Sequence, residues 1–578
     1  MRKVWKLRPP SPYALRLARE TNISVLKAQL LINRGISDSS SVVSFLSPRL
    51  SNLIDPMLLK DMDAAVELIL RTLEDRKPIT IYGDYDADGI TATALLLNFF
   101  SNLGIPVSFH IPNRLEEGYG LNPRAVETMA KKGAGLIITV DCGTANREEI
   151  ELARRLGMDV VVTDHHQVQE DFNPICPVIN PHRPDSSFSF KNLAGVGLSF
   201  FLSIAIRAAL RERGWFRNNP EPELKHYLDL VALGTVADMV PLLGQNRILV
   251  RAGIETMKTS IWPGIKALQK ISEVDSSDIT TYDLAFRLAP RLNAPGRMGE
   301  SEMGIHTLTT DKPPVAMDLA RQLNNMNNQR QVIERDILEQ IEETIMSRED
   351  LQNRRTLVFS EEGWHMGVLG IVASRLLERY HRPILVLTIQ NGMATGSGRS
   401  IDGFNLHQAL TKLGHLFERF GGHYHAAGFT IKASNIEAIA TGLEDLAQKD
   451  LSEEDLIPTI DIDAEMKLSD LTMETVREIR SLSPFGSGNP EPIYYAHSLH
   501  VIGSRVVGER HLKLRIKQGR NVIEAIGFGL AEMHPLAGRT INVVFSPEID
   551  QWQGYERLQL RIIDLEIVTP HSSKLIAR

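Results

Sequence analysis

Three aspartates, Asp84, Asp86 and Asp88, alternate directly after an apolar, strand-like run and before a helix-like one. In an extended segment alternate side chains point to the same side, so we expect the three carboxylates to lie together. Carboxylates this close repel one another unless cations neutralise them, and divalent cations such as Mg²⁺ bind oxygen ligands. The segment therefore predicts a divalent-cation site, although a single aspartate after a strand is more often a helix cap or a turn residue.

Further acids and imidazoles follow the next apolar elements of the chain: Asp141, Asp164, His165, His166 and Asp238. Asp141 and Asp164 come directly after strand-like runs, and ligands of parallel sheets gather where the strands end. Oxygen and imidazole ligands favour a pair of Mn²⁺ or Mg²⁺ ions, whereas a structural zinc site would use thiolates. Paired cations can activate water and hold the oxygens of a phosphate ester during its hydrolysis. The set therefore predicts a metal-dependent phosphodiesterase.

The elements that must position these residues alternate between strand-like and helix-like segments. Three nearly continuous apolar runs precede the acids: 78–82, 136–140 and 160–163. Helix-like stretches at 91–100 and 147–156 lie between or beside them. This alternation is typical of a parallel sheet that is covered by helices on both faces. We therefore expect an α/β fold, with an N-terminal segment at 1–50 and a first domain at 51–315.

A different pattern occupies residues 317–346, where apolar side chains recur at helical spacing without Gly or Pro. At the α-helical rise this segment could span roughly 45 Å, which suits a connector between two domains. We expect the connector helix at 316–350 and a second α/β domain at 351–450, because the α/β pattern restarts after the helix. Residues 451–578 contain runs that alternate with period two between Gly-containing turns, which predicts a small β-barrel.

The composition excludes several other classes of protein. The chain has 578 residues, 43% of them hydrophobic and 23% charged, which suits a globular protein of roughly three or four domains. It contains no run of about 18 apolar residues, so we expect no membrane span and a cytoplasmic location. The two cysteines, Cys142 and Cys176, match neither a zinc spacing nor a disulfide framework.

The charge distribution does not decide whether the protein binds nucleic acid. The net charge is −7, but residues 493–578 hold 11 Lys and Arg against 8 Asp and Glu. A mildly basic segment is compatible with nucleic-acid binding and equally with an ordinary solvated surface.

The motif DYDADG at 84–89, together with DHH at 164–166, resembles the DHH phosphoesterase superfamily. Further motifs follow in order along the chain: GVG at 195–197, residues 232–241, RLNAPGR at 291–297, GGHYHAAG at 421–428 and SPFGSGNPEP at 483–492. The ordered series covers roughly residues 50–570 and resembles the RecJ family. The resemblance implies a DHH parallel-sheet domain and a DHHA1 α/β domain joined by a long helix, plus a C-terminal OB-fold-like β-barrel.

The same resemblance implies an activity and partners. It points to a single-stranded-DNA-specific 5′→3′ exonuclease that releases 5′ mononucleotides and acts in DNA repair and recombination. A single-strand-binding protein and a RecQ-type helicase are partners by family analogy only. Two alternatives stay open: a small-molecule phosphoesterase of the same superfamily, which would lack the added β-barrel, and a non-catalytic replication scaffold, which would have lost metal ligands.

The resemblance also implies roles for the acids and imidazoles around two divalent cations, either Mn²⁺ or Mg²⁺. Asp86 and Asp141 would hold one cation, with Asp84 assisting or ligating it. The other cation would have four ligands: Asp88, Asp141, His165 and Asp238. His166 would stabilise the transition-state phosphate or position the nucleophilic water, and Asp164 would orient a histidine.

For the DNA, the resemblance implies binding residues in both α/β domains. Ser397 and Arg399 are similar to the family's segment for the terminal 5′ phosphate, and Arg114 could reach the same phosphate as a guanidinium fork. The remaining predicted binding residues come from two motifs: Gly421, Gly422 and His423, and Arg291, Asn293 and Arg297. The alternative interpretations are surface ion pairs for the arginines and an ordinary turn for the glycines.

In the predicted barrel, basic side chains share one face of a strand. Lys513, Arg515 and Lys517 alternate with apolar residues, and Arg505 adds a further cation that could contact a DNA backbone. The aromatic residues Trp552 and Tyr555 could stack bases. A merely solvated basic face is an equally good interpretation of this strand.

Overall fold

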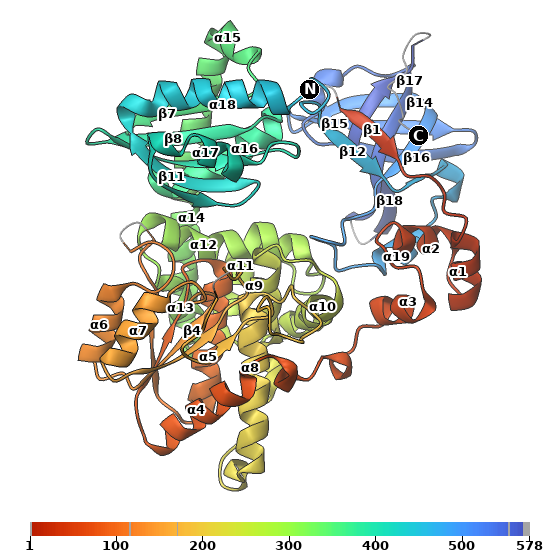
Figure 1. Ribbon diagram of the computed structural model, residues 1–578. Coiled ribbons are helices and arrows are strands. Elements are labelled where there is room, and N and C mark those ends of the chain that lie inside the picture. Colours follow the sequence, from red (N-terminus) through yellow and green to blue (C-terminus); the bar gives the residue numbers. More distant parts are fainter. Residues whose placement is uncertain (1–2, 115–116, 170–171, 553–554, 570–578) are drawn as a thin grey trace. The chain divides into compact units, whose positions relative to one another are not determined.

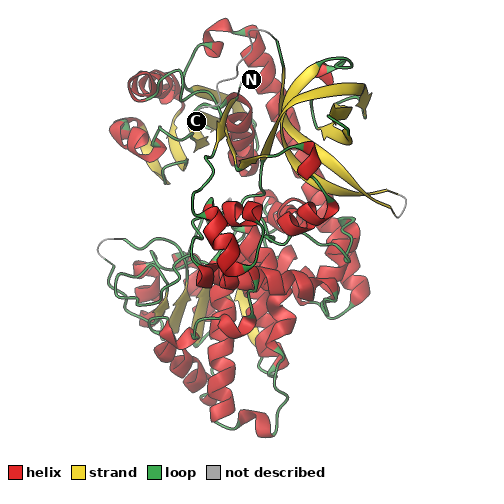
Figure 2. Ribbon diagram, turned by 90° about the vertical axis from the view of Figure 1, so that its right-hand side faces the viewer, coloured by secondary structure: helices red, strands yellow, loops and turns green. Residues whose placement is uncertain are grey.

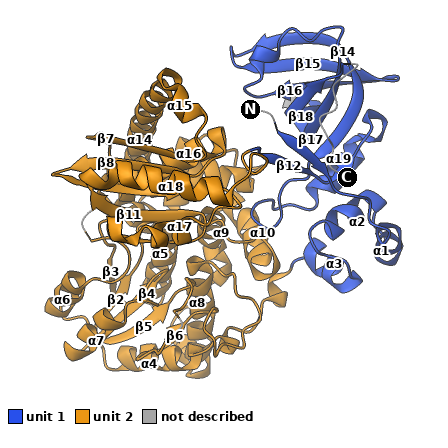
Figure 3. Cartoon of the chain, turned by 45° about the horizontal axis from the view of Figure 1, so that its top comes forward, with its two compact units in different colours: residues 1–48, 457–578 blue, residues 49–456 orange. Residues whose placement is uncertain are grey.

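The computed structural model describes residues 3–114, 117–169, 172–552 and 555–569. The chain forms two compact units, which Figure 3 shows in different colours. One unit combines Met1–Pro48 with Ile457–Arg578, and the other comprises Arg49–Leu456. Among the described residues, no helix combines the length and the apolar character needed to cross a membrane.

The larger unit contains two sheets, and the first has five strands in the order β3-β2-β4-β5-β6. Its strands, all paired in parallel, are β2 (Ile79–Tyr82), β3 (Val107–His110), β4 (Leu136–Val140), β5 (Asp159–Thr163) and β6 (Val178–Ile179). Successive side chains of β4 enter different cores: Ile138 packs on one face and Ile137 on the other. This burial on both faces confirms the parallel sheet that the apolar runs predict.

Helices cover both faces of this sheet (Figure 2). On one face lie α4 (Met62–Glu74), α5 (Ala87–Asn102) and α8 (Gly195–Glu212). On the other face lie α6 (Pro123–Lys131) and α7 (Arg147–Arg155). A further group of helices extends the first core: α9 (Leu228–Ala237), α10 (Gly244–Lys258), α11 (Pro263–Ile271), α12 (Ala289–Met298) and α13 (Met303–Thr309).

The long helix that the sequence predicts at 317–346 is α14, Pro313–Ser347. Its buried face changes character along its length. Ala316 and Leu323 pack into the core of the first sheet, whereas Ile337 and Ile341 pack into a second core. The residues buried between these two apolar stretches are polar: Asn327, Arg330 and Glu334. The helix therefore joins two separate hydrophobic cores, as a connector should.

The second sheet of this unit is mixed and has the strand order β10-β11-β9-β8-β7. Its strands are β7 (Leu357–Glu362), β8 (Ile384–Gln390), β9 (Met393–Arg399), β10 (Phe417–Gly422) and β11 (Ala426–Lys432). Only β7 and β8 pair in parallel. The accompanying helices are α16 (Leu369–Tyr380), α17 (Leu406–Lys412) and α18 (Ile436–Asp450).

The smaller unit contains the β-barrel expected near the C-terminus (Figure 1). Its strands are β14 (Tyr494–Val507), β15 (His511–Gln518), β16 (Asn521–Gly527), β17 (Thr540–Trp552) and β18 (Tyr555–Ile567). Pairing of β14 with both β15 and β17 closes the barrel, which removes its free edges. Leu512, Leu514 and Ile516 fill the interior, as their alternation predicts.

The first residues of the chain belong to this same unit. β1 (Val4–Leu7) pairs in parallel with β12 (Thr459–Ile462). Trp5 is only 1% exposed, packs edge-on against Tyr495 and donates a hydrogen bond from Nε1 to Asp564 Oδ2 at 2.8 Å. Helices follow at α1 (Ala14–Thr21), α2 (Val25–Ile32) and α3 (Ser39–Leu46). The N-terminal segment, for which the sequence predicts no role, therefore completes the core of the smaller unit.

Candidate metal centre

The carboxyl ends of β2, β4 and β5 bring the first acids to one edge of the sheet. Asp141 follows β4 directly, Asp164 follows β5 directly, and Asp84 lies just beyond β2. The expectation that Asp84, Asp86 and Asp88 share one extended segment is wrong at its last member. Asp86 is the N-cap of α5, and its Oδ1 accepts hydrogen bonds from the backbone N–H groups of Asp88 and Gly89 at 2.9 and 3.1 Å. This capping starts the helix before Asp88, so Asp88 lies in its first turn.

Helix packing nevertheless gathers the acids and imidazoles into three overlapping groups. In each group the potential ligand atoms lie within 4.8 Å of one another. The groups are Asp84 with Asp86 and Asp141, Asp88 with His165 and Asp238, and Asp141 with His165 and His166. Asp141 and His165 each belong to two groups, so they lie between the others. All six predicted metal ligands are therefore close enough together for one centre.

His165 is the point on which several carboxylates converge. Its Nε2 lies 3.0 Å from Asp141 Oδ1, 3.6 Å from Asp238 Oδ2 and 3.9 Å from Asp88 Oδ2. Even the shortest of these contacts lacks the direction of a hydrogen bond. Within the described part of the chain, four buried side-chain atoms of the centre consequently have no hydrogen-bond partner: Asp84 Oδ1, Asp141 Oδ1, His165 Nε2 and Asp238 Oδ2.

Such a concentration of buried atoms without partners is costly in a folded protein unless another species binds them. The four atoms are carboxylate oxygens and an imidazole nitrogen, which are the donors that Mn²⁺ and Mg²⁺ accept. Both the geometry and the donor chemistry of the centre therefore fit divalent cations.

The pKa values of the carboxyl groups reflect the same arrangement. Burial, followed by the charge of Asp86, raises the pKa of Asp88 to about 7. Burial and the charges of Asp88 and Asp86 raise the pKa of Asp238 to about 9. The pKa values of Asp84 and Asp141 are also raised, first by burial and then by neighbouring carboxylates. Bound cations would counter these pKa shifts, because their positive charge stabilises the ionised carboxylates.

The first residues of α8 contact two of the acids, Asp88 and Asp141. The backbone N–H groups of Gly195 and Val196 donate to the two oxygens of Asp88 at 2.6 and 2.9 Å. A side chain at Gly195 would force a shift, since its Cβ would lie 2.7 Å from Asp141 Cβ. Asp141 itself has a left-handed backbone with φ of 62°. The sequence shows the GVG motif at 195–197 but not this role, because the contacts join segments that are far apart in the chain.

Asp164 orients one of the two adjacent histidines. Its Oδ1 accepts hydrogen bonds from the backbone N–H groups of His165 and His166 and contacts His166 Nδ1 at 2.7 Å, while Oδ2 accepts from the Thr144 N–H. Burial opposes ionisation of Asp164, but the bonds from His166 and Thr144 outweigh it and lower its pKa. Burial likewise opposes protonation of His166, yet its bond to Asp164 raises the pKa of the ring.

His165 behaves in the opposite way. Burial, and then the charge of His166, lower the pKa of His165 to about 4. A neutral imidazole is the form that binds a metal ion, and a charged imidazolium is the form that stabilises phosphate oxygens. The pKa values of the two neighbouring histidines are thus shifted in opposite directions, which suits the predicted roles of His165 as a metal ligand and His166 as a cationic donor.

A cluster of guanidinium groups lies in the same unit, formed by Arg114, Arg297 and Arg399. Burial, followed by the like charges of Arg114, Arg330 and Arg399, lowers the pKa of Arg297 to about 10. Burial and the charge of Arg114 also lower the pKa of Arg399. Arg114 lies over the ring of Tyr85 at 5.1 Å, and Tyr85 stands between Asp84 and Asp86 in the chain. Partly buried, mutually repelling cations of this kind favour binding of an anion.

The second sheet and α16 position part of this arginine cluster. Arg399 Nε donates to Ser374 Oγ at 3.1 Å, and Arg297 Nη1 donates to the Gly367 carbonyl at 3.1 Å. Gly370, at the start of α16, borders both Arg399 and Ser397, because a Cβ on it would lie 3.1 Å from Arg399 Nη2 and 3.5 Å from Ser397 Oγ. The structure therefore brings the predicted phosphate ligands Ser397, Arg399 and Arg114 together with Arg297.

The other predicted DNA-binding residues have different contacts. Arg291 Nε donates to Asn324 Oδ1 at 3.0 Å, which ties α12 to α14. Asn293 Oδ1 accepts the Ala87 N–H at 2.7 Å and so supports the start of α5. Gly421 and Gly422 pair with β11, and His423 donates its backbone N–H to Ala426 in the exposed turn that follows. The hydrogen bonds of Arg291 and Asn293 thus join elements of the fold, whereas the turn around His423 is exposed.

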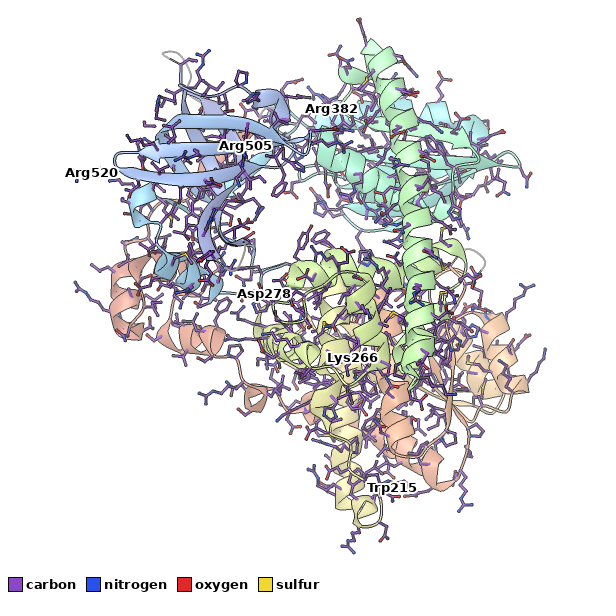
Figure 4. All side chains as sticks on the ribbon, turned by 180° about the vertical axis from the view of Figure 1, so that it is seen from behind. Trp215, Lys266, Asp278, Arg382, Arg505 and Arg520 are labelled. Atoms are coloured by element: carbon purple, nitrogen blue, oxygen red, sulfur yellow. The ribbon has the colours of Figure 1, made fainter. Side chains whose placement is uncertain are left out.

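In the barrel, the predicted basic face is partly paired. Cross-strand pairing places Arg505 opposite Lys513, whose Nζ lies 2.9 Å from Glu524. Arg515 and Lys517 are exposed. Figure 4 labels Arg505 on β14 and Arg520 at the turn between β15 and β16. Tyr555 is 70% exposed, while the side chain of Trp552 lies outside the described residues.

Comparison with known proteins agrees with this architecture. Three family models match successive parts of the chain: the DHH family N-terminal domain at 78–235, the DHHA1 domain at 353–449 and the RecJ OB domain at 462–564. The expected combination of DHH, DHHA1 and OB-like folds is thereby confirmed. The barrel match covers the segment that, by the sequence argument, smaller members of the superfamily would lack.

Relatives are similar over nearly the whole chain. The single-stranded-DNA-specific exonuclease RecJ of Bacillus subtilis (strain 168) is 34% identical, over 97% of this chain and 71% of its own. Its counterpart from Escherichia coli (strain K12) is 35% identical, over 93% and 95%. A crystal structure of RecJ from Thermus thermophilus in complex with Mn²⁺ superposes with a TM-score of 0.83 at 29% identity, covering 98% of this chain and 80% of that one. A second structure of that protein was determined in complex with Mg²⁺. The chain belongs to the RecJ family.

Proposed function

We propose that this chain is a single-stranded-DNA-specific exonuclease that hydrolyses phosphodiester bonds with two divalent cations. We further propose that it proceeds from the 5′ end and releases 5′ mononucleotides, in DNA repair and recombination. The observation that carries the proposal is the convergence of Asp84, Asp141, His165 and Asp238 with buried atoms that have no hydrogen-bond partner among the described residues. The names of the relatives support the substrate, since they are called single-stranded-DNA-specific exonucleases.

The ligand groups would divide between two cation positions. Asp84, Asp86 and Asp141 would hold one cation, and Asp88, His165 and Asp238 the other, with Asp141 close enough to serve both. When bound, Mn²⁺ or Mg²⁺ supplies charge neutralisation, polarisation of the phosphate oxygens and an acidified water. The side-chain positions alone support this division, because each group already brings its ligand atoms within reach of a single cation.

His166 would act on the phosphate through Nε2, the ring nitrogen that does not contact Asp164. Its Nδ1 is occupied by Asp164, so a protonated ring presents Nε2–H as a donor. Burial opposes protonation of His166, but its hydrogen bond to Asp164 raises the pKa of the ring, which favours the charged form, and the bond also fixes the ring's orientation. The imidazolium would donate to an oxygen of the scissile phosphate, where negative charge develops during hydrolysis.

The arginine cluster would explain a preference for one end of the strand. A terminal phosphate monoester carries more negative charge than an internal diester and has more oxygens for a guanidinium to bind. Arg297 and Arg399 are partly buried and held by neutral partners, Gly367 and Ser374, which leaves their charges available. Binding of a 5′ phosphate at Arg114, Arg297, Ser397 and Arg399 would fix the direction of degradation.

The barrel would add further contacts to the DNA strand. The exposed cations Arg505, Arg515 and Lys517 offer contacts to successive phosphates, and the exposed ring of Tyr555 offers a face for a base. Contacts of this kind read little sequence, so we expect weak sequence preference. The single-strand-binding protein and RecQ-type helicase remain proposed partners by family analogy.

The test is digestion of an oligonucleotide labelled at either end, single- or double-stranded, with Mn²⁺ or with EDTA. We expect labelled mononucleotide to appear first from the 5′-labelled single strand, only with Mn²⁺, and slow attack on the duplex. Early release from the 3′ label would refute the direction. Faster hydrolysis of dinucleotides than of long strands would favour the small-molecule phosphoesterase instead, and no hydrolysis with bound Mn²⁺ would favour the scaffold.

A further inference from the structure

Tyr119 lies on the loop between β3 and α6 and reaches two groups of the centre. Its hydroxyl donates a hydrogen bond to the backbone carbonyl of Asp141 at 3.1 Å and lies 2.9 Å from His166 Nδ1. The Tyr119 and His166 rings also meet edge to face, with centroids 5.2 Å apart and an interplanar angle of 62°. Neither spacing nor composition marks this tyrosine in the sequence.

The backbone on the C-terminal side of Tyr119 is firmly held. Gly118 and Gly120 flank the tyrosine with φ of 81° and 82°, a left-handed conformation that glycine adopts without strain. The buried hydroxyl of Tyr82 donates to the Gly120 carbonyl at 2.8 Å. Leu121 and Asn146 exchange two hydrogen bonds, at 3.2 and 3.1 Å. These hydrogen bonds therefore hold the backbone next to Tyr119 and limit where its hydroxyl can lie.

The hydrogen bonds around His166 Nδ1 allow one consistent assignment of protons. Nδ1 carries one hydrogen, which is donated to Asp164 at 2.7 Å, with the Tyr119 oxygen as a second acceptor. The hydroxyl hydrogen of Tyr119 then points to the Asp141 carbonyl. One phenol thus restrains both the His166 ring and the Asp141 backbone, whose φ of 62° is unfavourable for a non-glycine residue.

We propose that Tyr119 is a positioning residue, whose hydroxyl holds the His166 imidazole in the orientation that acts on the phosphate. The proposal deepens the proposed function and rests on it. The hydroxyl acts through His166, so its removal should lower turnover without weakening DNA binding. The effect should also become much smaller when His166 is absent, because only the hydrogen bond to the Asp141 carbonyl would then remain.

The test compares full-length Tyr119→Phe, His166→Ala and the double variant on a 5′-phosphorylated single strand with Mn²⁺. Tyr282→Phe, in the same unit and 60% exposed, is the matched control that loses a hydroxyl elsewhere. We expect Tyr119→Phe to lower kcat about tenfold, as loss of one hydrogen bond to a charged group does, with KM changed less than about twofold. In the His166→Ala background the same substitution should change kcat less than about twofold.

A second measurement is independent of activity. Histidine-labelled, metal-free protein should show the His166 ring signals, identified by their loss in His166→Ala, shifted or broadened in Tyr119→Phe and unchanged in Tyr282→Phe. Unchanged His166 signals, wild-type kcat in Tyr119→Phe, or equal losses with and without His166 would each overturn the proposal. An inactive wild-type protein would instead refute the exonuclease function, and the ring signals would still decide the role of Tyr119.

Discussion

Substitution of Gly195 by alanine tests whether α8 packs against Asp141 as tightly as the structure indicates. The added Cβ would lie 2.7 Å from Asp141 Cβ and 2.8 Å from its Oδ1. Carbon atoms in contact are about 3.5–4.0 Å apart, so the two residues must separate by about 1 Å. Asp141 is held in a left-handed conformation by its backbone bond to Thr163, and Gly195 is held by its bond to Asp88.

Whichever residue moves, a predicted metal ligand moves with it. A misplacement of about 1 Å at a catalytic group can cost about a hundredfold in rate, so we expect kcat/KM to fall by about that factor. Overpacking should also lower the free energy of unfolding by about 1–3 kcal/mol. Hydrolysis of a 5′-labelled single strand with Mn²⁺ and thermal unfolding of the same samples measure the two effects.

Gly197 provides the matched control within the same helix. A Cβ there would meet Leu193 Cδ2 at 3.4 Å, which is an ordinary contact. We expect Gly197→Ala to keep activity within about twofold and to gain up to about 1 kcal/mol, since alanine favours a helix over glycine. If Gly195→Ala retained activity close to that of Gly197→Ala, the close approach to Asp141 would not limit catalysis and the reasoning would fail.

Three further predictions concern charge, the phosphate site and the N-terminus. Because folding raises the pKa of Asp88 to about 7 and of Asp238 to about 9, the folded state binds these protons more tightly than the unfolded state. The melting temperature in EDTA should therefore fall as pH rises from about 4 to 9, and Mn²⁺ should reverse the fall; a rise with pH in EDTA would contradict this. Arg399→Ala should slow cleavage of 5′-phosphorylated strands about tenfold more than of 5′-hydroxyl strands, and equal losses would count against its role. Trp5→Ala should cost about 3–5 kcal/mol in unfolding of the smaller unit, measured by denaturant titration, whereas an unchanged midpoint would show that β1 is dispensable.

The elements that position the centre can be predicted well, because their signals are local. Apolar runs identify the strands that end before Asp141 and Asp164, and the helical spacing at 317–346 identifies α14. The position of Asp88 is mispredicted for a local reason as well. An alternating DxDxD pattern suits a strand, but the side chain of Asp86 caps a helix and draws Asp88 into its first turn.

The contacts that complete the centre could not be predicted, because they join distant parts of the chain. Gly195 reaches Asp88 and Asp141, and Tyr119 reaches His166, through the packing of a helix and a loop on the sheet. The pairing of β1 with β12 is an extreme case, since its partners lie far apart in the sequence. Such contacts leave no periodicity or spacing for a single sequence to reveal.

The centre also shows why its predicted metal ligands must be held firmly by the fold. Three carboxyl groups and an imidazole carry buried atoms without partners in the described part of the chain, and these atoms oppose folding, so other contacts must hold the groups in place. The backbone N–H of Asp141 donates to the Thr163 carbonyl, that of His165 to Asp164 Oδ1, and that of Asp238 to the Gly234 carbonyl. Each restraint acts before any cation binds, so the ligands need little reorganisation on binding. Affinity for the cations then comes from relieving the repulsion that folding creates, which links metal binding directly to the stability of this unit.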